Sequence, residues 1–222
     1  MGIDDAGRGP LIGPMFLAGA LLEAKEEEYL KHEGVADSKT LAHSTRVKLA
    51  GMIKDHCKKY KVVKAEAGDI DHALATGVNL NTLEAIKCAD IISDLLIGID
   101  ERVKVIVDCP SVNTVAWKAT LQTYLKKEHK IELHCEHKAD ANHASVSAAS
   151  ILAKVAREEA VTELKKTYGD MGSGYPSDPS TVAFVKKYGQ KYKDAGIFRK
   201  SWATWKQLFP SVGQSTLGAF KH

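Results

Sequence analysis

The 222-residue sequence lacks the motifs of several common protein classes. Its four cysteines are widely spaced and form no CxxC pair, so we expect reduced thiols and neither a zinc ribbon nor a thioredoxin-type redox site. No GxxxxGKS or GxxxxGKT string occurs, which excludes a P-loop nucleotide site. Charged residues begin at Asp4, unlike in a signal peptide, and the apolar runs are too short to span a bilayer. We therefore expect a soluble, cytoplasmic protein.

A large excess of one charge sign is also absent. The chain has 31 Lys and Arg against 28 Asp and Glu residues, a formal net charge of +3. Net charge therefore does not indicate a nucleic-acid partner, and a basic surface could arise only from local arrangement. With 44% hydrophobic and 27% charged residues, the chain can bury a core. Its length fits one large domain or a domain with a modest appendage, and nothing requires more than a monomer.

The hydrophobic pattern predicts alternating strands and helices. Strands are expected within residues 11–22, 60–67, 103–107 and 131–137, and helices over 44–60, 79–97, 111–126 and 143–168. Residues 172–179 are rich in Gly, Pro and Ser, and two shorter helical segments and a polar tail follow them. This order of elements predicts an α/β layered domain.

Four aspartates occupy positions where such a domain presents functional groups. Asp4 and Asp5 open the chain, Asp108 follows the apolar run of residues 103–107, and Asp140 precedes the long predicted helix. Because successive strand residues point to opposite faces, Asp4 and Asp5 can line one site only at a strand edge or bend. The alternative is that these residues are helix caps and surface acids, and for Asp140 alone N-capping is an equal alternative.

Converging carboxylates would repel one another, and their pKa values would rise unless a cation neutralised them. Hard oxygen ligands of this kind suit Mg²⁺ or Mn²⁺ rather than zinc. A site that holds two such ions suits in-line displacement at phosphorus, because one ion activates water and the other stabilises the leaving oxygen. From the residues alone, this site is a hypothesis.

Six segments, in order, resemble the motifs of type 2 ribonuclease H (ribonuclease HII), especially of its archaeal members. They are Gly2-Ile3-Asp4-Asp5-Ala6-Gly7-Arg8-Gly9-Pro10-Leu11-Ile12-Gly13-Pro14, Asp37-Ser38-Lys39, Gly77-Val78-Asn79, Val107-Asp108-Cys109-Pro110, Lys138-Ala139-Asp140 followed by Ser147-Ala148-Ala149-Ser150-Ile151-Leu152-Ala153-Lys154-Val155, and Gly172-Ser173-Gly174-Tyr175-Pro176-Ser177-Asp178-Pro179. The resemblance runs from residue 2 to about Phe209. It implies a ribonuclease H-like three-layer fold with a mixed central sheet in residues 1–168, a helical C-terminal part in 169–210 and a flexible tail in 211–222.

The resemblance implies an endoribonuclease that cleaves the RNA strand of RNA–DNA hybrids and ribonucleotides embedded in duplex DNA, as in ribonucleotide excision repair. It further implies cutting 5′ of the junction ribonucleotide, 3′-OH and 5′-phosphate products, and two Mg²⁺ or Mn²⁺ ions. By position, Asp4, Asp108 and Asp140 correspond to three of the family's four metal-binding acids. The fourth is normally Glu, but this sequence has Asp5, which is shorter by one C–C bond, about 1.5 Å. The alternative is therefore a catalytically weakened module that binds RNA–DNA hybrids.

The same resemblance assigns substrate contacts to Gly7-Arg8-Gly9 and Tyr175. The glycines let the backbone approach nucleic acid, Arg8 can reach a phosphate, and backbone contacts to the 2′-OH would select RNA. Tyr175 corresponds to the family's junction-sensing tyrosine, and the alternative is a turn tyrosine that covers the core edge. Further candidate phosphate contacts are Lys39 and Asn79, although an isolated lysine is usually a solvated surface charge.

The tail places Gln214, Leu217 and Phe220 at the spacing of peptides that dock into the DNA sliding clamp. In such peptides a second aromatic residue usually follows the first, but here Lys221 stands in its place. We expect this tail to bind a clamp.

Residues 7–13 superficially resemble a dinucleotide-binding loop. The third glycine comes one residue late, a proline intervenes, and almost no strand is expected before the loop. The sequence therefore favours the nuclease over a dinucleotide-dependent enzyme.

Overall fold

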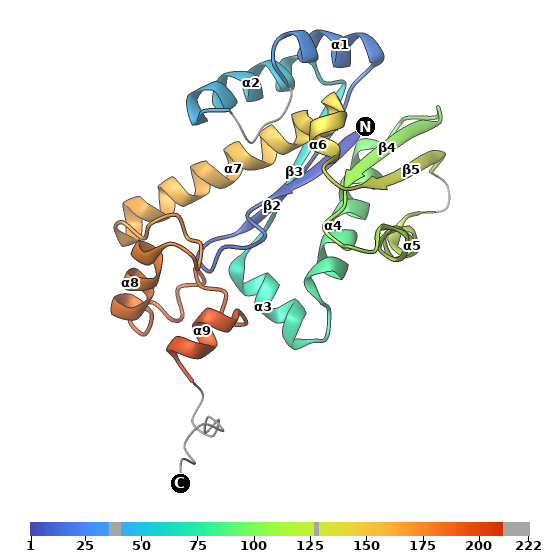
Figure 1. Ribbon diagram of the computed structural model, residues 1–222. Helices are drawn as coiled ribbons and strands as arrows, with labels where there is room; N and C mark the ends of the chain where they lie inside the picture. The colour runs from blue at the N-terminus through green and yellow to red at the C-terminus, as the bar shows by residue number, and fades with distance from the viewer. Residues whose placement is uncertain (36–40, 127–128, 211–222) are drawn as a thin grey trace.

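The computed structural model describes residues 1–35, 41–126 and 129–210, and shows a five-stranded sheet in the order β3-β2-β1-β4-β5 (Figure 1). Strand β1 pairs antiparallel with β2 and parallel with β4, so the sheet is mixed. Antiparallel β3 and parallel β5 complete its two edges. The strands are β1 (Gly2–Ala6), β2 (Met15–Leu21), β3 (Lys59–Ala65), β4 (Val103–Asp108) and β5 (Ile131–Glu136). The predicted α/β fold with a mixed central sheet is confirmed.

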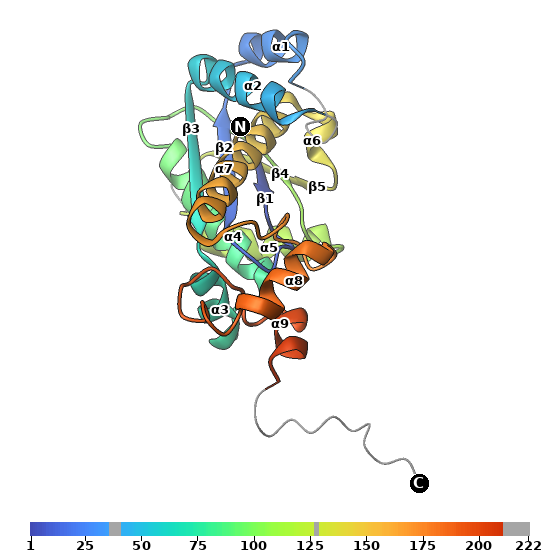
Figure 2. The same cartoon turned by 90° about the vertical axis from the view of Figure 1, so that its left-hand side faces the viewer.

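Helices cover both faces of the sheet, which gives three layers (Figures 1 and 2). One face packs against α1 (Ala24–His32), α2 (His43–His56) and α7 (Ala144–Tyr168). The other packs against α3 (Ala67–Ala75), α4 (Leu80–Leu95) and α5 (Thr114–Tyr124). In the part of the chain that the structure describes, no helix is long and apolar enough to cross a membrane.

The central strand β1 was not among the predicted elements, and it carries Asp4 and Asp5 in its middle. Its side chains alternate between the two faces, because Ile3 packs in the core on the α4 side and Ala6 in the core on the α7 side. Asp4 therefore faces α7 and Asp5 faces α4. Both residues lie within the β1–β2 ladder, and their convergence on one site stays a prediction.

Helix α7 approaches β1 so closely that the strand needs a glycine at the crossing. A Cβ atom on Gly2 would lie 2.1 Å from the carbonyl carbon of Ser145 and 2.2 Å from the amide nitrogen of Val146. The half of α7 that follows this crossing is lined with small buried residues, including Ala148, Ala149 and Ser150. This close packing places the α7 backbone directly beside the acidic part of β1.

Residues 169–210 contain α8 (Pro179–Tyr188) and α9 (Ala203–Leu208), which lie beyond the C-terminal end of α7 (Figure 1). Their apolar side chains form a separate core, which includes Phe184 and Trp205 and which also takes in Leu11 and Ile12 from the loop after β1. The segment is therefore packed on the N-terminal loop. The division of the chain after residue 168 stays a prediction.

We expect Gly2→Ala to lower the free energy of unfolding by about 1–3 kcal/mol, because its methyl group would collide with helix backbone rather than with a movable side chain. Urea-induced unfolding monitored by circular dichroism measures this loss. The control is Gly51→Ala in α2, where an added Cβ meets no atom within 4 Å and should stabilise the helix by about 0.5–1 kcal/mol. A Gly2→Ala protein as stable as its parent would contradict the close approach of α7.

Candidate active site

Asp4 is buried between β1 and α7, with 7% of its surface exposed. Ser150 of α7 hydrogen-bonds its side chain, and Asp4 Oδ1 accepts the amide hydrogen of Asp5 at 2.7 Å. Burial raises the pKa of Asp4 to about 8, and repulsion by Asp5 and Asp108 acts in the same direction, against the Ser150 hydrogen bond. In the absence of a cation, this carboxyl is therefore largely protonated at neutral pH.

Asp5 points to the opposite face of β1, toward Glu84 of α4. Burial and the charge of Glu84 raise the pKa of Asp5, whereas Arg8 and Lys154 lower it. Glu84 is only 2% exposed; its Oε2 pairs with Arg8, and its Oε1 has no hydrogen-bond partner within the described residues. Burial also raises the pKa of Glu84, in opposition to Arg8. The carboxyl groups of Asp5 and Glu84 thus repel each other, and the charge of Arg8 offsets only part of this repulsion.

Glu84 was not predicted as a site residue, although its position carried a signal. It follows Leu80 by four residues and precedes Cys88 by four, so it lies on the apolar side of the helix that the sequence correctly predicted. An acid at such a position is rarely fully buried unless it is paired.

Asp108 ends β4, as the sequence predicted, and its Oδ1 accepts the amide hydrogen of Ala139 at 2.8 Å. Asp140 lies one residue further on, inside the short helix α6 (Ala139–Asn142), and is 2% exposed. The N-cap positions of α6 and α7 are Lys138 and His143, so N-capping by Asp140 is wrong. Asp108 instead ties the start of α6 to the end of β4.

The four predicted aspartates come from three neighbouring elements, but they do not form a finished metal site. Asp4, Asp5 and Asp108 lie close enough for Asp108 to raise the pKa of the other two. Within the described ranges, no three His, Cys, Asp or Glu side chains are placed to hold one ion. The donor set nevertheless fits a hard divalent cation: it offers only carboxylate oxygens, they repel one another, and the buried Glu84 Oε1 lacks a partner. A bound cation would relieve this repulsion.

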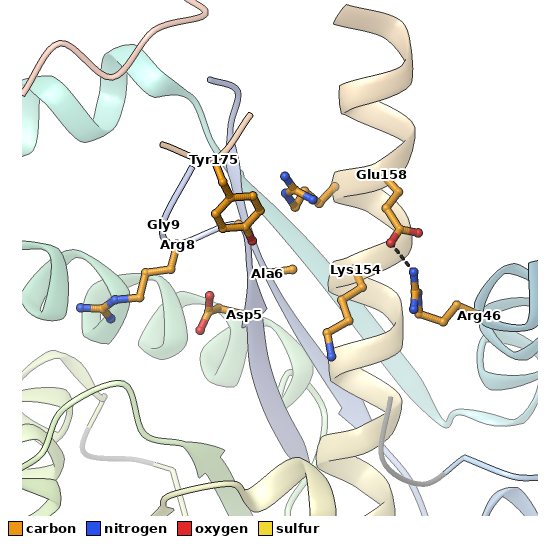
Figure 3. Close-up of a pocket in the computed structure, with 10 residues that line it drawn as sticks. Asp5, Ala6, Arg8, Gly9, Arg46, Lys154, Glu158 and Tyr175 are labelled. Carbon is orange, nitrogen blue, oxygen red and sulfur yellow. Dashed lines mark hydrogen bonds and ion pairs between the residues drawn. The ribbon is translucent and has the colours of Figure 1, made fainter. Parts of the chain in front are cut away.

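The glycine–arginine–glycine loop lies at the end of β1, beside Asp5. Gly7 has a φ of +83°, a conformation that L side chains rarely adopt. The Arg8 guanidinium is turned onto α4, where it pairs with Glu84 and donates to Asn81 Oδ1 at 2.7 Å. Figure 3 shows this side chain directed away from Lys154. The predicted phosphate contact of Arg8 therefore requires its release from α4 and stays a prediction.

An open groove of about 470 Å³ runs past this loop, and Tyr175 projects into it (Figure 3). A Cβ on Gly9 would lie 3.4 Å from the Tyr175 ring, so a larger residue there would crowd the tyrosine. The Arg157 guanidinium stacks 5.0 Å from the centre of that ring and donates to Ser173 O at 2.8 Å. Tyr175 therefore lines the groove, and Arg157 of α7 holds both its ring and the loop segment at Ser173.

The wall opposite Asp5 is basic, which the sequence did not predict. It consists of Arg46 from α2 and of Lys154 and Arg157 from α7. Arg46 donates to Leu41 O and pairs with Glu158. Because the chain's opposite charges nearly cancel, its net charge of +3 conceals this local cluster.

Of the remaining predicted substrate and partner residues, the structure describes Asn79, which does not line the groove. Asn79 is the N-cap of α4, where its side-chain oxygen accepts from Thr82 N at 3.0 Å, so it has a clear structural role. Its phosphate contact stays a prediction. Four further candidates lie outside the described residues: Lys39, Gln214, Leu217 and Phe220.

A family model for ribonuclease HII matches residues 1–205. A ribonuclease HII from Methanococcus maripaludis is 38% identical over 218 residues, which cover 98% of this chain and 90% of that protein. The solved ribonuclease H2 from Pyrococcus horikoshii OT3 has a TM-score of 0.77 at 36% identity, covering 93% of this chain and 95% of that one. In a PCNA:RNase HII complex from Archaeoglobus fulgidus, a chain has a TM-score of 0.79 at 33% identity, covering 99% and 98%. These matches confirm the resemblance inferred from the motifs.

We expect a divalent cation to raise the melting temperature more at pH 8.5 than at pH 5.5. The folded state raises the pKa of Asp4 from about 4 to about 8, so it binds more protons than the unfolded state between these values. The metal-free fold therefore loses stability as the pH rises through this window. A cation binds the deprotonated carboxylates and restores the stability that the metal-free fold loses. Thermal unfolding in EDTA or in MgCl₂ at the two pH values measures the difference.

The matched control is Asp4→Asn, which has nearly the same shape but no titrating carboxyl at this position. It should reduce the pH dependence of the metal-free melting temperature between about pH 5 and 8 without abolishing it, because burial also raises the pKa values of Asp5 and Glu84 to about 7. A parent protein whose metal-induced shift is equal at both pH values would contradict the assignment of the raised pKa to Asp4.

Proposed function

The chain belongs to the ribonuclease HII family, whose members are endoribonucleases of RNA–DNA hybrids, and we propose that it cuts the RNA strand in the groove beside Asp5. Substrates would include single ribonucleotides embedded in duplex DNA, cut on the 5′ side to leave 3′-OH and 5′-phosphate ends. One observation carries this proposal. Asp5 lines a groove whose opposite wall holds three cationic side chains and a tyrosine, and the charge of Asp108 acts on both Asp5 and the neighbouring Asp4.

Asp4, Asp5, Asp108 and Asp140 would hold two divalent ions, Mg²⁺ or Mn²⁺. When bound, such ions activate water and neutralise charge on the leaving oxygen. The carboxylates of β1 and β4 are attached to the central strands of the sheet, so their backbone positions are rigid. Asp108 is held further by its hydrogen bond to the start of α6, the helix that carries Asp140.

The chain's other groups position the nucleic acid. Lys154 and Arg157 project from α7 into the groove, where they would bind backbone phosphates and balance the negative charge of the substrate. Tyr175 offers a ring face for stacking on a sugar or base, and its contact with Arg157 restricts its orientation. The loop of residues 7–9 would contact the ribose, which is the feature that separates RNA from DNA.

The aspartate at position 5 leaves the alternative of a weakened module that only binds hybrids. The retained Asp4, Asp108 and Asp140 and the family match over residues 1–205 favour the enzyme. The variant Asp5→Glu separates the two readings of this position. Faster cutting by the variant than by the parent would measure the cost of the shorter side chain. Cutting by the variant alone would mean a disabled enzyme on an intact scaffold.

We expect Asp108→Asn to reduce cleavage at a single ribonucleotide in duplex DNA by at least about 100-fold, the scale of losing one charge-stabilising group. The asparagine oxygen can still accept the Ala139 amide hydrogen, so the anchor of α6 should survive. Gel analysis of an end-labelled duplex with Mg²⁺, Mn²⁺ or EDTA measures the rate and the position of the cut.

The parent should cut with Mg²⁺ or Mn²⁺ and not in EDTA. Full activity of Asp108→Asn, or equal cutting of a duplex without ribonucleotides, would refute the proposed function. Unchanged circular dichroism of the variant excludes unfolding as the cause of lost activity.

We further propose that the C-terminal tail binds a sliding clamp. The neighbour from A. fulgidus in complex with PCNA supports this idea, together with the spacing of Gln214, Leu217 and Phe220. The double variant Leu217→Ala/Phe220→Ala should weaken binding to the clamp of the same organism at least about tenfold, because it removes both apolar anchors. Calorimetry measures the affinity, and cleavage of free duplex should not change. Equal affinity of both proteins would place the contact elsewhere.

A further inference from the structure

Arg199 is completely buried behind the loop of residues 7–14. Its Nη2 donates to Gly7 O at 2.6 Å, its Nη1 to Arg8 O at 2.7 Å and its Nε to Gly13 O at 3.0 Å. Within the described ranges, every hydrogen bond of this guanidinium ends on a backbone carbonyl of the loop. The buried guanidinium of Arg199 thus holds the backbone of the loop rather than neutralising a carboxylate.

Trp202 extends this contact by one residue. Its indole Nε1 donates to Gly9 O at 3.1 Å, and the Arg199 guanidinium lies 5.0 Å from the centre of its ring. Asp71 of α3 holds the intervening segment by accepting from the amides of Lys200 at 2.7 Å and Ser201 at 2.9 Å. Three consecutive carbonyls, those of residues 7–9, are therefore held by one C-terminal segment.

Because the peptide bonds are trans, holding the loop's carbonyls also fixes the direction of its backbone N–H groups. In a trans peptide, the carbonyl of one residue and the N–H of the next point in opposite directions, and the described chain has no cis peptide. Since the carbonyls of Gly7 and Arg8 point at Arg199, the N–H groups of Arg8 and Gly9 point away from it. Neither N–H donates a hydrogen bond within the described residues, and Pro10 has none to offer.

The charge of Arg199 strengthens these two donors. Burial lowers its pKa to about 10, as does the neighbouring Arg157, so the guanidinium remains charged at neutral pH. A cation on the carbonyl side polarises each peptide group, which makes the opposite N–H a better donor. Two adjacent N–H groups that point the same way can donate to one oxygen ligand.

We propose that Arg199, assisted by Trp202, is a positioning residue for ribose recognition. It turns the Arg8 and Gly9 N–H groups toward the groove, where they bind the 2′-oxygen of the ribonucleotide at the cleavage site. The inference rests on the proposed function, because it concerns the same groove. Part of the selectivity for RNA would then depend on a residue that follows Gly7 by 192 positions.

The test compares the affinities for two duplexes that differ only in one ribonucleotide. Binding is measured by fluorescence anisotropy with Mg²⁺ in the Asp108→Asn background, so that neither duplex is cut. The background protein should bind the ribonucleotide duplex more tightly than the all-DNA duplex. Arg199→Lys keeps the charge but cannot reach three carbonyls, and should lower this ratio about fivefold to tenfold, the worth of one or two hydrogen bonds.

Two further variants separate orientation from general damage. Trp202→Phe removes only the donor to Gly9 O and should lower the ratio about twofold, which keeps the proposal testable should Arg199→Lys not fold. Lys200→Gln removes a neighbouring surface charge that lies 3.6 Å from Asp194 and should leave the ratio unchanged. Partial unfolding weakens both affinities together and does not move their ratio.

The proposal is overturned if the ratio in folded Arg199→Lys and Trp202→Phe equals that of the background, or if the background does not distinguish the two duplexes. Failure of the proposed function is a separate result, because it would appear as absent cleavage by the parent protein. If the parent cuts at the ribonucleotide but the variants keep the same ratio of duplex affinities, the proposed nuclease function stands and only the role of Arg199 is refuted.

Discussion

The close packing of α7 on β1 determines how deeply Asp4 lies. Because Gly2 has no side chain, the backbone of α7 passes directly over the strand, and the small residues that follow the crossing keep helix and sheet together. Ser150 thereby reaches Asp4, which is left with little exposed surface and a pKa raised to about 8. The same helix carries Lys154 and Arg157 to the opposite side of the groove. One packing contact thus sets both the burial of Asp4 and the position of Lys154 and Arg157.

Charge in this region is balanced by separate local pairings rather than by the net charge of the chain. Arg8 is held by Glu84 on one face of the sheet, and Arg46 by Glu158 on the other. Between these pairs, burial and the charges of neighbouring acids raise the pKa values of Asp4 and Asp5, and Asp108 contributes to both shifts. Deprotonating these crowded carboxyl groups costs stability in the metal-free fold, and the same crowding favours a hard divalent cation. The cost of ionising the metal-free site and its affinity for metal therefore have the same cause.

Sequence reasoning was most accurate where a segment has a strong apolar spacing. The apolar spacing predicted α4 and α7 and the strand β4 to within a few residues, whereas the short α1, with Leu30 as its single buried residue, has too weak a pattern to predict. Strand β1 escaped prediction because two of its five residues are acids, which a central strand otherwise avoids. Its role came from the family resemblance, as did those of the other acids. The roles of Glu84 and Arg199 were not predicted, because they depend on contacts with residues that lie 76 and up to 192 positions away in the sequence.

The loop after β1 shows why such long-range partners matter for function. Its conformation includes positive φ angles at Gly7 and Gly13, and the glycines permit this shape without enforcing it. What holds the loop is the C-terminal segment: Gly174 O accepts from Leu11 N at 2.7 Å, Ile197 O accepts from Gly13 N at 2.8 Å, and Arg199 binds the carbonyls. A free glycine-rich loop would lose conformational entropy on binding a substrate, whereas a loop already fixed by tertiary contacts does not. The helical C-terminal part therefore contributes to recognition by holding in advance the backbone that meets the substrate.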